Sequence, residues 1–274
     1  MKTHESILAV NAMERAAGQR DFAAGIEAAA AAAERPVHIV AVDEVDAFTG
    51  ELAAGRFSHL VISGSEASIT EEQEWEAGLR AVLDAALDGG FPVLGLCYGA
   101  QLIAKHLGGP EAVGKLETPE FGYVRIPLPD ASSAEPAPPP AGRPPWAGLF
   151  AGIENPVGIE MHYDCIRAAP PGFRVLSRSD RAIQIMVHEE APVVAYQFHP
   201  EFSYDFADQV FAERAVEEPR WQEIYRNELS GSRELEQNVR FLTNALSLTG
   251  CPALRRPAEG SWSSEGSARQ RWIR

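Results

Sequence analysis

The sequence contains little cysteine. Only Cys97, Cys165 and Cys251 occur among 274 residues. An odd number of cysteines without metal-ligand spacing argues against a disulfide scaffold and against a zinc site. A protein of this kind is typical of a reducing compartment, so we expect a cytoplasmic location and no metal.

Long hydrophobic runs and basic residues are also scarce. No apolar run approaches the ~18 residues of a membrane span, and the N-terminus has no apolar segment typical of a signal peptide. Lys and Arg number 24 against 39 Asp and Glu, which gives a formal net charge of −15. Because nucleic-acid binding needs a basic surface, we expect neither a nucleic-acid partner nor a membrane. A phosphate-binding loop of the form G-x-x-x-x-G-K followed by Ser or Thr is absent as well.

The hydrophobic pattern predicts an α/β fold. Strands are predicted over 7–10, 37–42, 59–63 and 91–96, and helices over 22–34, 71–87 and 100–107. This alternation favours a mostly parallel open sheet with helices on both faces. Three β-rich runs within 173–198 predict a small antiparallel patch at the end of that sheet, and residues 205–248 are predicted to be helical.

Two segments differ from the rest in composition. Residues 127–145 contain eight of the twenty prolines, and such a run cannot form a regular backbone hydrogen-bond ladder. It is therefore an exposed insertion or a docking segment for a partner. Residues 251–274 carry five arginines against two glutamates, and we expect a mobile basic tail. The prediction is one domain over 1–250 that contains the proline-rich insertion, followed by the tail.

The stretch GLCYG, residues 95–99, places Cys97 between two glycines directly after a predicted strand. Such a cysteine is either a packing residue or a nucleophile. A G-x-C-x-G pattern between a strand and a helix is typical of a nucleophile elbow, in which the central residue has a strained backbone and the glycines remove clashing Cβ atoms. The N-terminus of the next helix favours a thiolate. The N–H of Tyr98 would then face a developing oxyanion.

A second motif, YQFHPEF at residues 196–202, supplies a histidine and an acid. In an extended chain, residues i and i+2 point to the same side, so Glu201 can accept a hydrogen bond from His199. The other ring nitrogen is then left for Cys97. The alternative is an ordinary histidine at a strand end, but its combination with the elbow favours a Cys-His-Glu triad. In α/β-hydrolases the acid precedes the histidine, so that fold is disfavoured.

With these two motifs, the sequence resembles the class I glutamine amidotransferases, in particular the glutaminase domain of GMP synthase and its stand-alone relatives. The segments HLVISGS (59–65) and EFGYVRI (120–126) match further family motifs. MHYDCI (161–166) matches more weakly, at a place where the family has a turn. The resemblance spans roughly residues 5–248. It implies that Cys97 attacks the side-chain amide of glutamine to form a γ-glutamyl thioester, with His199 as acid and base.

The same resemblance assigns residues to the oxyanion and to the substrate. The oxyanion hole would combine the N–H of Tyr98 with one from the loop at Gly64 and Ser65. Gln101 would hold the α-amino and α-carboxylate groups of the substrate, together with the backbone at Tyr163 and Asp164.

Three further residues near the expected site have two interpretations each. His162 is as compatible with stabilising its turn as with touching the substrate. Glu120 and Tyr123 fit a strand start with a half-buried aromatic ring as well as a place beside the pocket.

The sequence departs from the family pattern at two places. The family loop Gly-Gly-Pro reads Gly64-Ser65-Glu66 here, and Tyr163 stands where the family has glycine. Glu66 adds a negative charge near a site that would bind an α-carboxylate. Tyr163 would reshape the pocket around the α-groups.

Three functions remain open. The chain is a glutaminase that supplies ammonia to a separate synthase, a stand-alone hydrolase of a γ-glutamyl amide or peptide, or a binding protein that has lost catalysis. The intact Cys97, His199 and Glu201 argue against the third. Because no synthase domain follows in the chain, the first function needs a partner; we favour it and keep the second as the alternative. The substrate is L-glutamine or a γ-glutamyl compound, and the hydrolysis needs no cofactor.

Overall fold

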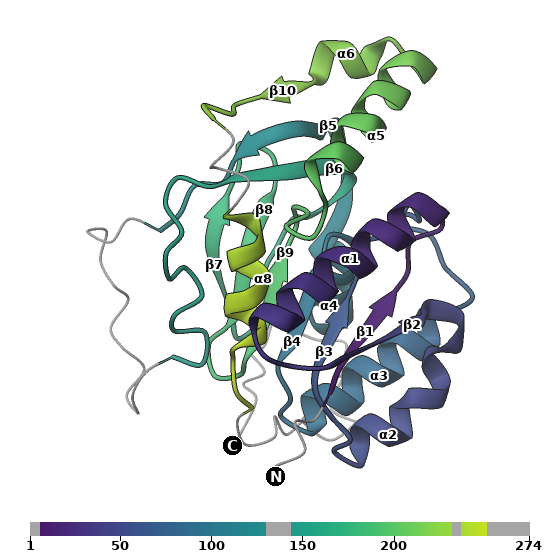
Figure 1. Cartoon of the computed structure of the whole chain (residues 1–274). Helices are drawn as coiled ribbons and strands as arrows, with labels where there is room; N and C mark the ends of the chain where they lie inside the picture. The colour runs from purple at the N-terminus through teal and green to yellow at the C-terminus, as the bar shows by residue number, and fades with distance from the viewer. Residues whose placement is uncertain (1–5, 130–143, 232–236, 251–274) are drawn as a thin grey trace, which may run out of the picture.

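A seven-stranded sheet forms the centre of the molecule (Figure 1). The structure is a computed structural model and describes residues 6–129, 144–231 and 237–250. The strand order is β2-β1-β3-β4-β9-β8-β7. Pairs from β2 to β9 are parallel, whereas β8 pairs antiparallel with both β9 and β7. The predicted parallel sheet with an antiparallel end is therefore confirmed. Its strands are β1 (Ser6–Asn11), β2 (Val37–Ala41), β3 (Phe57–Ile62), β4 (Val93–Leu96), β7 (Phe173–Arg178), β8 (Ile183–His188) and β9 (Val193–Tyr196).

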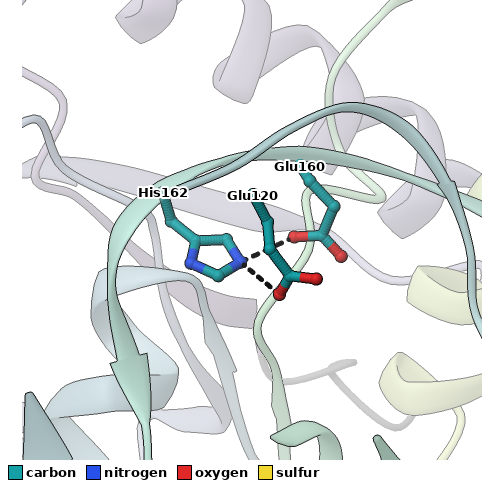
Figure 2. Close-up of side chains that lie close together, drawn as sticks. All are labelled: Glu120, Glu160 and His162. Carbon is teal, nitrogen blue, oxygen red and sulfur yellow. Dashed lines mark ion pairs between the residues drawn. The ribbon is translucent and has the colours of Figure 1, made fainter. Parts of the chain in front are cut away.

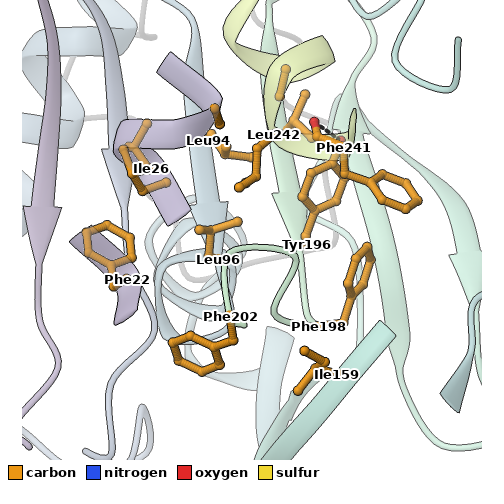
Figure 3. Close-up of a cluster of buried hydrophobic side chains, with 14 of the residues drawn as sticks. Phe22, Ile26, Leu94, Leu96, Ile159, Tyr196, Phe198, Phe202, Phe241 and Leu242 are labelled. Atoms are coloured by element: carbon orange, nitrogen blue, oxygen red, sulfur yellow. Dashed lines mark hydrogen bonds between the residues drawn. The ribbon is translucent and has the colours of Figure 1, made fainter. Parts of the chain in front are cut away.

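Helices cover both faces of this sheet. Alternate residues of β1 point to opposite sides, so Ile7 joins one buried core and Leu8 joins the other. The first core lies under α1 (Ala16–Ala32) and α8 (Asn238–Leu246), and Figure 3 shows their side chains against β4 and β9. The second core lies under α2 (Thr49–Ala53), α3 (Glu76–Asp88) and α4 (Tyr98–Gly108). Burial on both faces explains why these strands are continuous apolar runs.

A smaller sheet of three strands lies beside the main one. Its order is β10-β5-β6, with β5 (Val113–Arg125) antiparallel to β6 (Val157–Ile166) and β10 (Arg226–Asn227) parallel to β5. The expected turn at 161–166 is wrong, because these residues lie inside β6, where all except Tyr163 pair with β5. The interpretation of Glu120 and Tyr123 as a half-buried strand start is also wrong, since both side chains are fully buried.

The predicted helix over 205–248 is interrupted. Helix α5 (Tyr204–Glu217) ends before Pro219, and α6 (Arg220–Ile224), β10 and α8 follow. Glu218 is extended (φ −142°, ψ 116°), as the residue before a proline is expected to be. The pattern also missed η1 (Val42–Phe48), η2 (Pro110–Ala112) and α2.

The two unusual segments lie largely outside the described residues. This applies to 130–143 of the proline-rich insertion and to all of 251–274, so both assignments stay predictions. None of the helices in the described ranges is long and apolar enough to cross a membrane.

Helix α1 approaches the backbone of Glu201 closely, and Gly25 makes this possible. A Cβ atom on Gly25 would overlap the carbonyl oxygen of Glu201. Gly50 in α2 is a helical glycine without such a contact, since a Cβ atom there would meet nothing within 4 Å.

Replacing Gly25 with Ala should lower the free energy of unfolding by about 1–3 kcal/mol, because the helix must move away from the backbone it contacts. Alanine is otherwise the better helix former, so Gly50→Ala should leave stability unchanged or raise it by up to ~1 kcal/mol. Urea unfolding of both variants measures the difference. Equal stability of the two would contradict the close approach of α1.

Candidate active site

Cys97 is the single residue between β4 and α4. Its backbone angles are φ +46° and ψ −101°, a conformation that costs energy for any residue with a side chain. Its N–H donates to the carbonyl of Tyr196 on β9 over 2.8 Å, and its carbonyl accepts from the N–H of Gln101 over 3.0 Å. The predicted elbow is thus present, and the sulfur lies at the N-terminus of α4.

The two glycines of the elbow allow close backbone contacts. A Cβ atom on Gly95 would lie 2.7 Å from the carbonyl carbon of Gly99, and one on Gly99 would overlap the carbonyl oxygen of Ile62. The N–H of Gly99 also donates to the carbonyl of Ser63 over 3.0 Å. Any side chain at either glycine would push α4 away from β3 and β4.

His199 and Glu201 lie beside Cys97 in the loop after β9. Nδ1 of His199 is 2.8 Å from Oε1 of Glu201, and both side chains are buried. His199 and Cys97 both line the pocket and both lie against Gly64. Burial alone would lower the pKa of His199, but the charges of Glu201 and of Cys97 raise it to about 10. The arrangement therefore favours an imidazolium at His199.

The loop at Gly64 and Ser65 contacts this pair. A Cβ atom on Gly64 would lie 2.7 Å from Cε1 of His199 and 3.4 Å from Cβ of Cys97. Ser63 fixes the loop, since its hydroxyl donates to the carbonyl of Gly64 over 2.7 Å. Ser65 lines the pocket, and its hydroxyl accepts from the N–H of Ala67 over 3.1 Å. Tyr98, the first residue of α4, is buried.

Glu66 has a different role from the expected one. Its carboxylate accepts from the N–H of Glu14 over 2.7 Å and from that of Arg15 over 3.4 Å, at the start of α1. The positive end of a helix favours an anion there. The negative charge is thus bound at the N-terminus of α1, although Glu66 still lines the pocket.

Gln101, Tyr163 and Asp164 also line the pocket. Nε2 of Gln101 donates to the carbonyl of Asp164 over 2.7 Å. In the Asp164 carboxylate, Oδ2 accepts from Ser68 Oγ (2.6 Å) and from the N–H of Ile69 (3.0 Å), while the buried Oδ1 has no hydrogen-bond partner among the described residues. The carbonyl of Asp164, part of the backbone that we expected to bind substrate, is therefore already hydrogen-bonded, and the carboxylate offers a further acceptor.

Tyr163 belongs to the outer wall of the pocket. Its ring meets that of Trp221 on α6 edge-on, with 5.0 Å between the centroids. The pocket has a volume of about 430 Å³ and extends from Cys97 and His199 to residues of α5 and α6. The wall on these helices includes Phe206, Arg214 and Arg220.

A buried cluster of Glu120, Glu160 and His162 lies on β5 and β6 (Figure 2). Nε2 of His162 is 3.3 Å from Oε2 of Glu120 and 2.9 Å from Oε2 of Glu160. These three side chains have donor atoms within 4.8 Å of one another and are candidate metal ligands. This cluster was not predicted from the sequence. The signal was the i, i+2 spacing of Glu160, His162 and Asp164 in an otherwise apolar stretch.

Thiol alkylation tests the environment of the two described cysteines. Cys97 lines the pocket, whereas Cys165 is buried on β6 and burial raises the pKa of its thiol. Iodoacetamide should label Cys97 at least about tenfold faster, because the thiolate is the reactive form. Peptide mapping by mass spectrometry measures both sites, with Cys97→Ala as the control. Faster labelling of Cys165 would contradict this geometry.

Known proteins are similar to this chain in sequence. The family model "Glutamine amidotransferase class-I" matches residues 20–218. The glutamine-hydrolysing GMP synthase subunit of Thermococcus kodakarensis is 34% identical over 126 residues, which are 45% of this chain and 58% of that protein. The protein of the same name from Pyrococcus furiosus is 36% identical over 115 residues, 41% of this chain and 52% of its own length. The chain thus matches a little over half of each relative.

Solved structures agree in fold. A glutamine amidotransferase from Methylobacillus flagellatus aligns with a TM-score of 0.64 at 18% identity, over 95% of this chain and 99% of that one. A glutamine amidotransferase from Thermotoga maritima aligns with a TM-score of 0.60 at 17% identity, over 89% and 96%. With the family model covering most of the sequence, the chain belongs to the class I glutamine amidotransferase family.

Proposed function

We propose that the chain hydrolyses the side-chain amide of L-glutamine through a γ-glutamyl thioester on Cys97. The observation that carries this proposal is the elbow cysteine beside a buried histidine whose Nδ1 lies 2.8 Å from Glu201. A nucleophile, a base within reach and an acid that orients the base are the parts that such acyl transfer needs.

The steps follow from this geometry. The Cys97 thiolate attacks the amide carbon, and the negative charge that forms on the amide oxygen is stabilised by the N–H of Tyr98 and by one from the loop at Gly64 and Ser65. His199 then gives a proton to the leaving nitrogen, so ammonia departs and the thioester remains. Water attacks the thioester while His199 takes its proton. Glutamate leaves and the thiolate returns, with one water consumed for each glutamine.

Asp164 supplies a binding group for the substrate. Its Oδ1 is a buried acceptor without a partner among the described residues, and a buried unpaired acceptor is costly. The α-ammonium group of glutamine would satisfy it with a charge-assisted hydrogen bond. Gln101 holds the same residue in place through the carbonyl.

The second question about the reaction is which molecule accepts the ammonia. Relatives are named as subunits of a glutamine-hydrolysing GMP synthase, which supports a separate synthase as the ammonia acceptor. One observation favours the alternative, a stand-alone hydrolase of γ-glutamyl amides or peptides. The pocket of about 430 Å³ continues to the wall of Tyr163 and Trp221, and this volume is typical of sites for ligands larger than one amino acid.

Replacing Cys97 with Ala should abolish glutamine hydrolysis, and His199→Ala should be nearly as damaging because it removes both base and acid. Glu201→Gln should lower kcat by about 10–10³-fold, since orientation and charge are lost while a hydrogen-bonding group remains. Cys165→Ala is the matched control and should keep wild-type activity. Wild-type turnover by Glu201→Gln would remove Glu201 from the mechanism.

Assays on the isolated chain separate the two functions. If a synthase accepts the ammonia, the purified protein should hydrolyse glutamine slowly, and added partner should raise kcat more than it lowers KM. A stand-alone hydrolase should reach a typical ~1–10³ per second unaided on its own γ-glutamyl substrate. Steady-state rates on glutamine and on a panel of γ-glutamyl peptides measure this. Fast turnover of a γ-glutamyl peptide by the isolated chain, with glutamine as a poor substrate, would contradict the synthase-coupled function.

A further inference from the structure

A side chain outside the proposed triad contacts the sulfur of Cys97. Nε2 of Gln197 lies 3.7 Å from Sγ, and the side chain of Gln197 is completely buried. A role for this residue was not predicted from the sequence, although it lies in the same motif as His199. Its amide group belongs to a hydrogen-bonded network that runs from the sulfur into the small sheet.

Backbone partners fix the orientation of this amide. Oε1 of Gln197 accepts from the N–H of Ile166 over 3.3 Å. A backbone N–H can only donate, so the oxygen of the amide must face Ile166 and its nitrogen must face the sulfur. The same Oε1 accepts from Nε2 of Gln101 over 3.3 Å. Gln101 is fixed in turn, because its Nε2 also donates to the Asp164 carbonyl, which only accepts.

The far end of the network is the buried cluster of His162, Glu120 and Glu160. The carbonyl of Asp164 also lies 2.9 Å from Nδ1 of His162, so that nitrogen must carry a proton. The other nitrogen, Nε2, points between the two carboxylates (Figure 2). Nδ1 is therefore hydrogen-bonded, whereas Nε2 lies at ion-pair distance from both carboxylates without hydrogen-bond geometry. The two carboxylates favour an imidazolium through their charge.

The charges support this protonation state. Burial alone would lower the pKa of His162, but Glu120 and Glu160 raise it well above 6.5, and the charge on Cys97 adds to the rise. Burial raises the pKa of the Glu160 carboxyl.

We propose that Gln197 is a further catalytic residue, which donates Nε2–H to the sulfur of Cys97 whenever the sulfur carries negative charge. His162, held by Glu120 and Glu160, is a positioning residue that acts through Asp164 and Gln101. This rests on the proposed role of Cys97 as the nucleophile.

The donor would act at two points of the reaction. In the resting enzyme it stabilises the thiolate that attacks. In the thioester the sulfur is neutral, and it regains its charge as the leaving group when water attacks. Loss of the donor should therefore slow turnover and leave the binding of glutamine almost unchanged.

Two substitutions at Gln197 test the donor. Gln197→Met keeps a similar volume but has no donor, and Gln197→Glu keeps the oxygen for Ile166 while it replaces the donor by an acceptor. Both should raise the pH of half-maximal iodoacetamide labelling at Cys97 by about one unit, the size expected for one lost hydrogen bond to a charged group. Both should lower kcat by about tenfold or more with KM within about twofold. The control is Gln222→Leu on the exposed surface of α6, which should change neither quantity.

Glu160→Gln tests the positioning end. It should also raise the pH of half-maximal labelling at Cys97, but by less than the Gln197 substitutions do, because His162 keeps its contact with Glu120. The other titratable groups around the sulfur and its pocket stay in place in all variants; they include His199 and Glu201 after β9, His162 and Asp164 on β6, and Glu66 before α3. Variants that fold, by circular dichroism and urea unfolding, yet label and turn over like the wild type would overturn the proposal.

Two further results test the network and the proposed function separately. Labelling does not require substrate, so it tests the network even if glutamine is the wrong substrate. Persistent glutamine hydrolysis by Cys97→Ala would instead refute the proposed function itself. Total-metal analysis of the purified protein should find no stoichiometric metal. One metal per chain that disappears in Glu160→Gln would overturn the protonated state of His162.

Discussion

The backbone conformation of Cys97 is the constraint on which the rest of the site depends. A positive φ of 46° at a residue with a side chain persists only where its surroundings hold it. Here β9 holds the N–H of Cys97 through Tyr196. The glycines at 95 and 99 allow the close backbone contacts that the turn requires. The parallel sheet thus supplies the energy that keeps the sulfur at the start of α4.

The histidine and the acid depend on the same sheet. His199 donates its backbone N–H to the carbonyl of Ile159 on β6 over 2.9 Å, which joins the main sheet to the small one directly at the site. Phe202 stacks on the imidazole with 4.3 Å between the ring centroids. Helix α1 covers Glu201 through the close approach at Gly25. These contacts exclude water from the His199–Glu201 pair and strengthen their electrostatic interaction.

Local patterns made part of this site predictable. The elbow depends on two glycines within five residues, and the pairing of His199 with Glu201 depends on their i, i+2 spacing. Both need little knowledge of the tertiary fold. The partners of His162 depend instead on how β5 pairs with β6, with Glu120 opposite His162. Those of Gln197 depend on how α4 and β6 pack against the segment after β9. Hydrophobic periodicity does not give that register. The hydrogen bonds of Glu66 to the start of α1 could not be predicted for the same reason, since its partners lie about fifty residues away in the sequence.

Acid-quenched peptide mapping during glutamine turnover tests the central claim most directly. The protein is mixed with excess glutamine, quenched within the steady state and digested, and the peptides are analysed by mass spectrometry. The account predicts a γ-glutamyl group on the peptide that contains Cys97, which hydroxylamine removes as expected for a thioester. Continued release of ammonia with no such group on Cys97, or with the group on another residue, would contradict it.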